Sequence, residues 1–193
     1  MRILSIDFDY FVDTDLETRS FYFPDGNDNL PHELNLFIWN NCYSFKEELR
    51  SIGVIKDYDY MCELLKNLKP RKTLIADSHR EIEKFFDDVR SSDKVELVHI
   101  DFHHDMFVTG GDKLDCGNWL RFFADIKPDA KITWVKREDS SRESMFGEFP
   151  YNETTDITEV KGDFDLVFLC LSTPWTPPHL YDKFKEMCKA LNS

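Results

Sequence analysis

The sequence predicts a three-layer α/β/α sandwich in which helices cover both faces of a mainly parallel sheet. Short apolar runs alternate along the chain with segments of helical periodicity. The runs are apolar at successive positions rather than at every second one, as in parallel strands buried on both faces. With 193 residues, 41% of them hydrophobic, the chain is long enough to form one domain over residues 1–193.

Five runs are predicted as strands because they are short and rich in branched apolar residues. In chain order they are 2–8 (RILSIDF), 73–76 (TLIA), 95–102 (VELVHIDF), 131–135 (KITWV) and 165–171 (DLVFLCL).

Three helices are predicted from apolar residues that recur at helical spacing. One follows Ser78 and Glu81, which have the spacing of a capping box. The three stripes are Met61, Leu64, Leu65 and Leu68; Ile82, Phe85, Phe86 and Val89; and Leu180, Phe184, Met187 and Leu191. The polar segments 25–32 and 136–156 are predicted loops.

The charge of the chain restricts its partners. It carries 24 lysines and arginines against 37 aspartates and glutamates, a formal net charge of −13. Such a field repels nucleic acid and anionic membranes and favours cationic ligands or metal ions. We therefore expect neither nucleic acid nor a membrane as partner, while the oligomeric state stays open.

Cysteine spacing and the N-terminal segment indicate the compartment. The five cysteines form no Cys-x-x-Cys pair, which argues against a zinc knuckle or a disulfide framework. The N-terminus meets Asp7 after a short apolar run, so a signal peptide is not expected. No run approaches the roughly 20 apolar residues of a membrane span. The expected location is the cytoplasm.

Side chains of the metal-ligand type follow three of the predicted strands. The first strand runs into Asp7 and Asp9, the second into Asp77 and His79, and the third into residues 101–105, DFHHD. The carboxyl ends of parallel strands share one edge of the sheet, where ligands bind in α/β folds. We therefore expect these side chains to meet.

Residues 101–105 carry the strongest signal. Residues two apart in an extended segment point to the same side, so Asp101, His103 and Asp105 are expected to converge on one point. Buried carboxylates and imidazoles are costly unless an ion compensates them. His99 is expected to face the packing side of its strand instead.

Three other residues, Asp7, Asp9 and His79, are weaker signals when each motif is taken alone. An isolated Asp-x-Asp after a strand is usually part of a turn or a helix cap, and an isolated histidine at such a place is usually a residue in the first turn of a helix. Together with the cluster they provide ligands for two divalent ions. Mixed oxygen and nitrogen ligation suits Mn²⁺, with Zn²⁺, Fe²⁺ or Co²⁺ as alternatives. A pair of ions ~3.5–4 Å apart is a common arrangement for hydrolysis.

Four short motifs resemble those of the ureohydrolase superfamily, which includes arginases and agmatinases. Residues 101–105 match its D-x-H-x-D element, and residues 77–79 (DSH) look like its G-G-D-H element. Residues 116–118 (CGN) are similar to the S-G-N element of arginases, and residues 5–9 (SIDFD) to S-x-D-x-D. The resemblance covers residues 1–10 and 73–120 and implies an arginase-like fold with two Mn²⁺ ions per chain.

The resemblance also implies roles for single residues. Asp101 and His104 would be catalytic, with His179 the other candidate for proton transfer because the family's histidine is replaced by Leu120. Asn118 would bind substrate. The implied ligands are His79, Asp101, Asp105 and Asp7 for one ion and Asp101, His103, Asp7 and Asp9 for the other.

The chain departs from the family pattern at its N-terminus. The S-x-D-x-D element precedes D-x-H-x-D rather than following it, so a circularly permuted or rearranged sheet is needed to bring Asp7 and Asp9 to the ions. Residues 169–175 stand in its usual place and contain no aspartate. No acid that would bind a guanidinium group is evident.

The short chain resembles compact arginase-like proteins that act on arginine side chains within ribosomally made precursor peptides. These proteins leave ornithine in the peptide and release urea. The implied enzyme is a Mn-dependent guanidino hydrolase, and the implied partner is an arginine-containing precursor peptide. The acidic composition suits such a partner.

Three other interpretations fit part of the sequence. In a haloacid-dehalogenase-like phosphatase, Asp7 would be the nucleophile, Asp9 the acid and Gly162-Asp163 a late Mg²⁺ site, leaving the histidines unexplained. A deacetylase-type hydrolase on the same scaffold would use one Zn²⁺. A decayed site would bind metal without turnover. Metal stoichiometry separates these cases.

Overall fold

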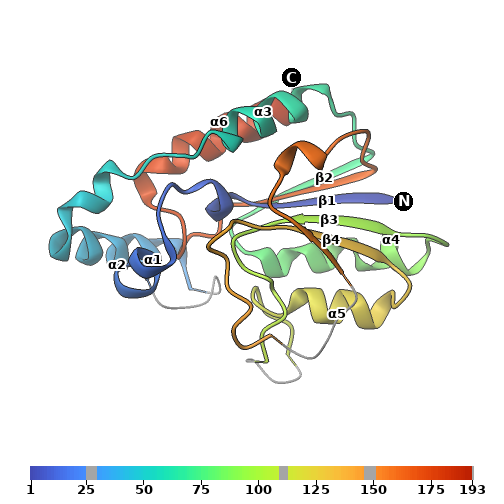
Figure 1. Cartoon of the computed structure of the whole chain (residues 1–193), viewed down its shortest axis with the longest axis horizontal. Helices are drawn as coiled ribbons and strands as arrows, with labels where there is room; N and C mark the ends of the chain where they lie inside the picture. Colours follow the sequence, from blue (N-terminus) through green and yellow to red (C-terminus); the bar gives the residue numbers. More distant parts are fainter. Residues whose placement is uncertain (25–29, 109–112, 146–150, 193) are drawn as a thin grey trace.

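One parallel sheet organises the molecule (Figure 1). The computed structural model describes residues 1–24, 30–108, 113–145 and 151–192. In these residues the strand order is β2-β6-β1-β3-β4-β5, and every pairing is parallel. The strands are β1 (Arg2–Asp7), β2 (Lys72–Ala76), β3 (Glu96–Ile100), β4 (Lys131–Val135), β5 (Asn152–Thr154) and β6 (Leu166–Cys170).

Helices cover both faces of this sheet, which confirms the predicted α/β class and agrees with three layers. In Figure 1, α3 (Asp57–Asn67) and α6 (Tyr181–Leu191) lie on one face, and α4 (Phe86–Arg90) and α5 (Trp119–Ile126) on the other. A narrower, arginase-like fold stays a prediction. None of the described helices is long and apolar enough to cross a membrane.

The core explains why the strands read as continuous apolar runs. In β1, Leu4 and Ile6 pack toward α3 and α6, whereas Ile3 packs toward α4 and α5. All three are buried, and each such side chain contributes about 1.5–3 kcal/mol. Ser5, on the same side as Ile3, is a polar exception with a role described below.

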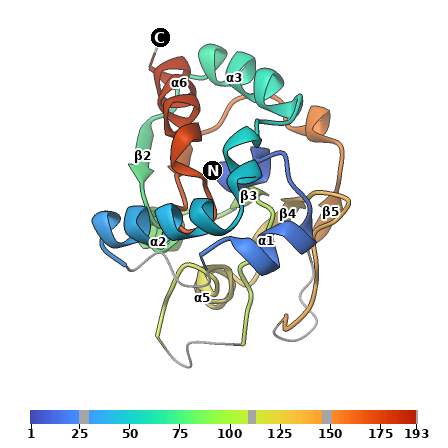
Figure 2. The same ribbon diagram turned by 90° about the vertical axis from the view of Figure 1, so that its left-hand side faces the viewer.

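Two helices that periodicity did not predict lie at the carboxyl end of the strands (Figures 1 and 2): α1 (Leu16–Tyr22) and α2 (His32–Phe45). The buried side of α2 consists of Asn35, Trp39 and Tyr43, while Phe37 and Phe45 are exposed, so no apolar stripe marks it. Asn35 and Trp39 bond to Thr173, which ties α2 to the loop after β6.

Short 3-10 helices complete the chain: η1 (Phe8–Phe11), η2 (Glu47–Ser51), η3 (His79–Phe85), η4 (Ile157–Glu159) and η5 (Pro178–Leu180). The helix predicted after Ser78 therefore begins as η3 and becomes α-helical only in α4. Ser78 Oγ accepts a hydrogen bond from the Arg80 amide rather than from Glu81.

The predicted strands are all present, and their ends differ from the prediction by at most two residues. The loop predicted over 136–156 is partly wrong, because β5 within it pairs with β4 through its backbone. Its polar side chains gave no strand signal, since an edge strand needs little apolar surface. Of the loop predicted over 25–32, residues 25–29 lie outside the described residues.

Candidate metal centre

The strand order brings the two strands that carry most of the candidate ligands together. β1 and β3 are neighbours, with Ile6 opposite Ile100, so Asp7 and Asp101 follow at adjacent strand ends. This pairing places Asp7 beside Asp101 although the two residues are far apart in the sequence. Figure 2 looks onto this end of the sheet. His79 reaches the same place from the first residue of η3.

Three carboxylates surround one nitrogen of His79. Its Nδ1 lies 3.1 Å from Asp7 Oδ2, 3.2 Å from Asp101 Oδ2 and 3.1 Å from Asp105 Oδ2, and all four side chains are buried. Donor atoms close enough to share one ion belong to His79, His99, Asp101 and Asp105, which we call the inner group. Asp7 and His79 make a further such set with Cys170.

The His79 ring is held so that Nδ1 faces these carboxylates. Its Nε2 lies 2.7 Å from Ser5 Oγ, and the ring is stacked between Trp119 and Phe168 with centroid distances of 4.8 and 5.2 Å. When Nε2 donates to the serine hydroxyl, Nδ1 keeps its lone pair for an ion. Such outer hydrogen bonds fix the tautomer and orientation of ligand histidines.

The prediction that Asp101, His103 and Asp105 converge on one point is wrong. Strand β3 ends at Ile100, and Asp105 adopts a left-handed conformation with φ 51°. This turn brings Asp105 to the inner group, where Trp119 Nε1 donates to its Oδ2 at 2.5 Å. His103 points elsewhere, and only Asp101 is shared.

A second set of donors, the outer group, consists of Asp9, Asp101 and His103. His103 Nδ1 lies 3.0 Å from Asp9 Oδ2 and 3.7 Å from Asp101 Oδ1. The His103 side chain is 21% exposed, whereas those of Asp9 and Asp101 are at most 1% exposed. Trp175, from the loop after β6, lies against His103 with 4.7 Å between the ring centroids and the two rings tilted. The outer group is therefore the more solvent-accessible of the two groups, and we call its exposed side, at His103 and Trp175, the entrance.

A buried arginine that the sequence did not reveal supports Asp9. Arg19 on α1 is 1% exposed and its Nη1 lies 3.4 Å from Asp9 Oδ2. Its Nη2 donates to the carbonyl oxygens of Asp9 and Val12 at 2.7 and 3.1 Å. The guanidinium also lies 3.9 Å above the Phe102 ring. α1 thus contributes a cation beside the outer group.

The expectation that His99 faces away from the cluster is also wrong. His99 precedes Asp101 by two residues, so both side chains point to the same side of β3. Its Nε2 lies 3.5 Å from Asp101 Oδ2 and 3.8 Å from Asp105 Oδ2. The sequence already carried this signal, because His99 and Asp101 are in phase along the strand, whereas the expectation treated them as out of phase.

The residues present fit divalent ions by two tests. Asp9 Oδ1 and both ring nitrogens of His99 are buried and make no hydrogen bond within the described part of the chain. Burying such groups without partners is costly, and a coordinated ion would satisfy them. The donors are carboxylate oxygens and imidazole nitrogens, a set that suits Mn²⁺, Fe²⁺, Co²⁺ or Zn²⁺.

The buried groups of the cluster shift one another's pKa values. Burial raises the pKa of Asp7 and Asp105, and neighbouring carboxylates raise it further. Burial opposes protonation of His79, but hydrogen bonds to Asp101 and Asp7 raise its pKa to about 9. Burial also opposes protonation of His103, but the charges and hydrogen bonds of Asp9 and Asp101 together raise its pKa to about 10. An incoming ion must therefore displace protons from these imidazoles.

His99 is the electrostatic exception. Burial lowers the pKa of its imidazole to about 3, so the ring is neutral at physiological pH. A neutral imidazole with no hydrogen bond to the described residues keeps a lone pair for an ion.

The two proton-transfer candidates lie outside both groups. His104 accepts from the Met106 amide through Nδ1 and donates to the Glu143 carbonyl through Nε2. His179 is held between the Tyr43 hydroxyl and the Ile52 carbonyl. Both placements favour a structural role over proton transfer.

Asn118 also has a structural setting. It is buried at the start of α5, where its Oδ1 accepts from the Asp115 amide and its Nδ2 donates to the Lys113 carbonyl. These bonds close the turn over residues 113–118. The placement does not support the predicted contact with substrate.

The phosphatase interpretation requires an acidic site that the structure puts at the wrong end of the sheet. The Asp163 carbonyl accepts from Arg2 at the start of β1, whereas Asp7 ends the same strand. Five residues of strand separate the two ends by about 16 Å. Gly162-Asp163 therefore cannot join Asp7 and Asp9 in one Mg²⁺ site.

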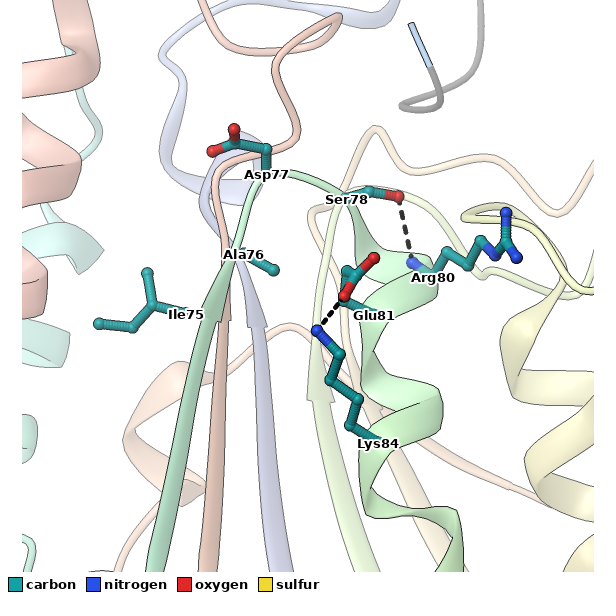
Figure 3. A pocket seen from close by; sticks show the side chains of 7 residues that line it. All are labelled: Ile75, Ala76, Asp77, Ser78, Arg80, Glu81 and Lys84. Atoms are coloured by element: carbon teal, nitrogen blue, oxygen red, sulfur yellow. Dashed lines mark hydrogen bonds and ion pairs between the residues drawn. The ribbon is translucent and has the colours of Figure 1, made fainter. Parts of the chain in front are cut away.

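A surface pocket at the carboxyl end of edge strand β2 is separate from the metal centre (Figure 3). It is lined by residues 75–78, 80, 81 and 84. Its charged groups partner one another, since Glu81 pairs with Lys84. None of its lining residues belongs to the inner or the outer group.

Comparison with known proteins yielded no protein-family model, curated protein sequence or solved structure that matches this chain.

Proposed function

We propose that the chain is a dinuclear metal hydrolase that converts arginine side chains in a peptide to ornithine and urea, with Mn²⁺ as the expected metal. One observation carries the proposal: the inner and outer groups share Asp101, so two ions would lie side by side with one carboxylate between them. Paired ions of this kind are typical of hydrolytic centres. The motif resemblance supplies the reaction class.

The donor groups in the structure overlap with the ligand sets that the resemblance implies, which supports the proposal. His79, Asp101 and Asp105 gather in the inner group with Asp7 beside them, and His103, Asp101 and Asp9 form the outer group. The motifs come from three separate stretches of chain, and the fold brings these residues together at one end of the sheet.

The reaction adds water to the guanidinium carbon of arginine and breaks its bond to Nε. Urea leaves with the water oxygen, and the former Nε–H takes both protons of that water to become the ammonium group of ornithine, so atoms and charge are conserved. Bound divalent ions supply an activated water and electrostatic stabilisation in such centres. His103 lies where solvent enters, so the substrate would approach past His103 and Trp175. Buried Ser5, Trp119 and Arg19 hold His79, Asp105 and Asp9 in place.

Peptidyl arginine is favoured over free arginine by the setting of Asn118 and by the charge of the chain. Asn118, the predicted contact for the amino-acid end of the substrate, is engaged within its own turn. A guanidinium group on a long side chain can reach a recessed centre while the peptide stays outside. The net charge of −13 favours a basic peptide.

Trp175 is expected to bind the guanidinium group at the entrance. A cation over an indole face is worth about 1–2 kcal/mol, so Trp175→Ala should raise KM for an arginine peptide about 5- to 30-fold. Trp175→Phe, which keeps an aromatic face, should raise it less. Steady-state kinetics at constant metal content measure both, and equal KM values in all three proteins would contradict this role.

The proposed function is tested by measuring the metal content and the reaction products of the same preparation. The full chain is stripped with a chelator, reloaded with Mn²⁺, and analysed by elemental mass spectrometry. Urea is assayed colorimetrically, and ornithine is identified in the peptide by mass spectrometry. We expect about two ions per chain, urea release from an arginine peptide, and loss of turnover on renewed chelation.

The same preparation separates the other interpretations. One Zn²⁺ with deacylation of acetyl-lysine peptides would indicate the deacetylase, and phosphate release with one Mg²⁺ the phosphatase. Two bound ions without urea from peptides or free arginine would overturn the guanidino hydrolase. A free-arginine activity that exceeds the peptide activity would overturn the assignment of substrate.

A further inference from the structure

We infer that His99 is a direct ligand of the inner ion, so that the inner group is a two-imidazole site that fills before the outer group. The inference rests on the metal-binding part of the proposed function and is independent of the substrate. None of the motifs includes His99, which sits two residues before the D-x-H-x-D element.

The distances around His99 are close to those of atoms that share an ion. Its Nε2 lies 3.5 Å from Asp101 Oδ2 and 3.8 Å from Asp105 Oδ2, beyond the range of a good hydrogen bond. Two donors each about 2.1 Å from one ion lie roughly 3.0–3.5 Å apart in octahedral or tetrahedral geometry. The 3.5 Å distance of His99 is at the upper end of that range and the 3.8 Å distance is just beyond it, while the contacts of His79 Nδ1, at 3.1–3.2 Å, fall within it.

Burial makes an alternative role for the His99 nitrogens difficult. The side chain is fully buried, and within the described residues neither nitrogen makes a hydrogen bond. A packing role would leave both polar atoms unsatisfied at a cost of about 1–3 kcal/mol each. Its ring is edge-on to His79 at 5.4 Å and to Trp119 at 5.2 Å, which fixes it beside the inner carboxylates.

The outer group differs from the inner group in three ways. It offers one imidazole, that of His103, which is partly exposed to solvent. The charge of Asp9 is already offset by the buried guanidinium of Arg19. Imidazole favours Zn²⁺, Co²⁺ and Fe²⁺, whereas carboxylate suits Mn²⁺ and Mg²⁺. The inner group should therefore hold the first ion more tightly, and the outer ion should exchange more readily.

X-ray absorption of the zinc-loaded full chain tests the coordination directly. The chelator-treated protein receives one equivalent of Zn²⁺, and the imidazoles around zinc are counted from the outer-shell scattering. Two imidazoles are expected for the wild-type chain, from His79 and His99. A single imidazole in the wild-type chain would overturn the inference, whatever any variant does.

Variants give a second readout in zinc affinity. His99→Gln should leave one imidazole and raise the dissociation constant for the first Zn²⁺ more than 100-fold, beyond the 10- to 100-fold typical of outer hydrogen-bond partners. His104→Gln is the matched control: a neighbouring buried histidine outside both groups, for which the zinc site should be unchanged. His103→Ala should also keep two imidazoles.

An affinity of folded His99→Gln within 100-fold of wild type would overturn the role of His99 as a direct ligand, since losses up to that size are typical of an outer hydrogen-bond partner. Near-ultraviolet circular dichroism shows whether the variant is folded. Absence of urea release from these same proteins would overturn the proposed function and leave the zinc coordination as it is measured.

Discussion

Asp101→Asn is expected to abolish turnover and to reduce the metal content from about two ions to one or none. Asp101 is the one residue that both groups share, with Oδ2 toward His79 and His99 and Oδ1 toward His103. The amide cannot bridge two cations as a carboxylate does. Charge stabilisation by bound metal is worth several kcal/mol, so kcat/KM should fall by about 10³-fold or more.

Asp77→Asn is a suitable control for the loss of one aspartate. Asp77 follows β2 at the same end of the sheet but is exposed at the edge pocket and belongs to neither group (Figure 3). The Asp77→Asn variant should retain metal and activity. Elemental analysis and urea assays on both variants measure the contrast, and full turnover in folded Asp101→Asn would exclude the metal centre as the catalytic site.

Much of this centre could be predicted from the sequence because its parts follow from local rules. Continuous apolar runs identify parallel strands, and parallel strands place their carboxyl ends at one edge. Asp7, His79 and Asp101 each stand just beyond such a run, so their meeting follows from the sheet alone. The order of the strands did not need to be known.

The positions of residues whose role depends on the local backbone conformation were predicted less accurately. The division of Asp105 and His103 between two groups depends on the left-handed turn at Asp105, which a period-two rule does not contain. His104 stands between predicted ligands in the sequence, yet its two nitrogens are used by backbone groups. Neighbours in sequence after the end of a strand need not share a direction.

The role of Arg19 could not be predicted from the sequence, because it depends on a contact between two segments of the chain. It lies on a helix with no apolar stripe, and only the fold brings that helix over Phe102 and Asp9. A surface arginine and a buried one look alike in the sequence. Burial is rare for arginine unless it is paired, so this position matters for stability.

Arg19→Met is expected to lower the free energy of unfolding of the chelated protein by about 3–5 kcal/mol. Removing one partner of a buried ion pair leaves the other charge uncompensated, here that of Asp9. The variant also loses the hydrogen bonds to the Asp9 and Val12 carbonyls. Urea unfolding followed by circular dichroism measures the change. Arg90→Met, in an exposed pair with Asp87, should cost at most about 1 kcal/mol.

Bound metal should reduce this loss of stability if the outer group holds an ion beside Asp9. It should leave the loss unchanged if Arg19 and Asp9 form only a local ion pair. A divalent ion held by Asp9, Asp101 and His103 would itself compensate the Asp9 carboxylate. The destabilisation by Arg19→Met should therefore be smaller in saturating Mn²⁺ than in chelator, since an ion that binds only the folded state stabilises it. An equal loss in both conditions would show that no ion reaches Asp9. Because the inner group does not contain Asp9, the first equivalent of Zn²⁺ should bind this variant as it binds the wild-type chain.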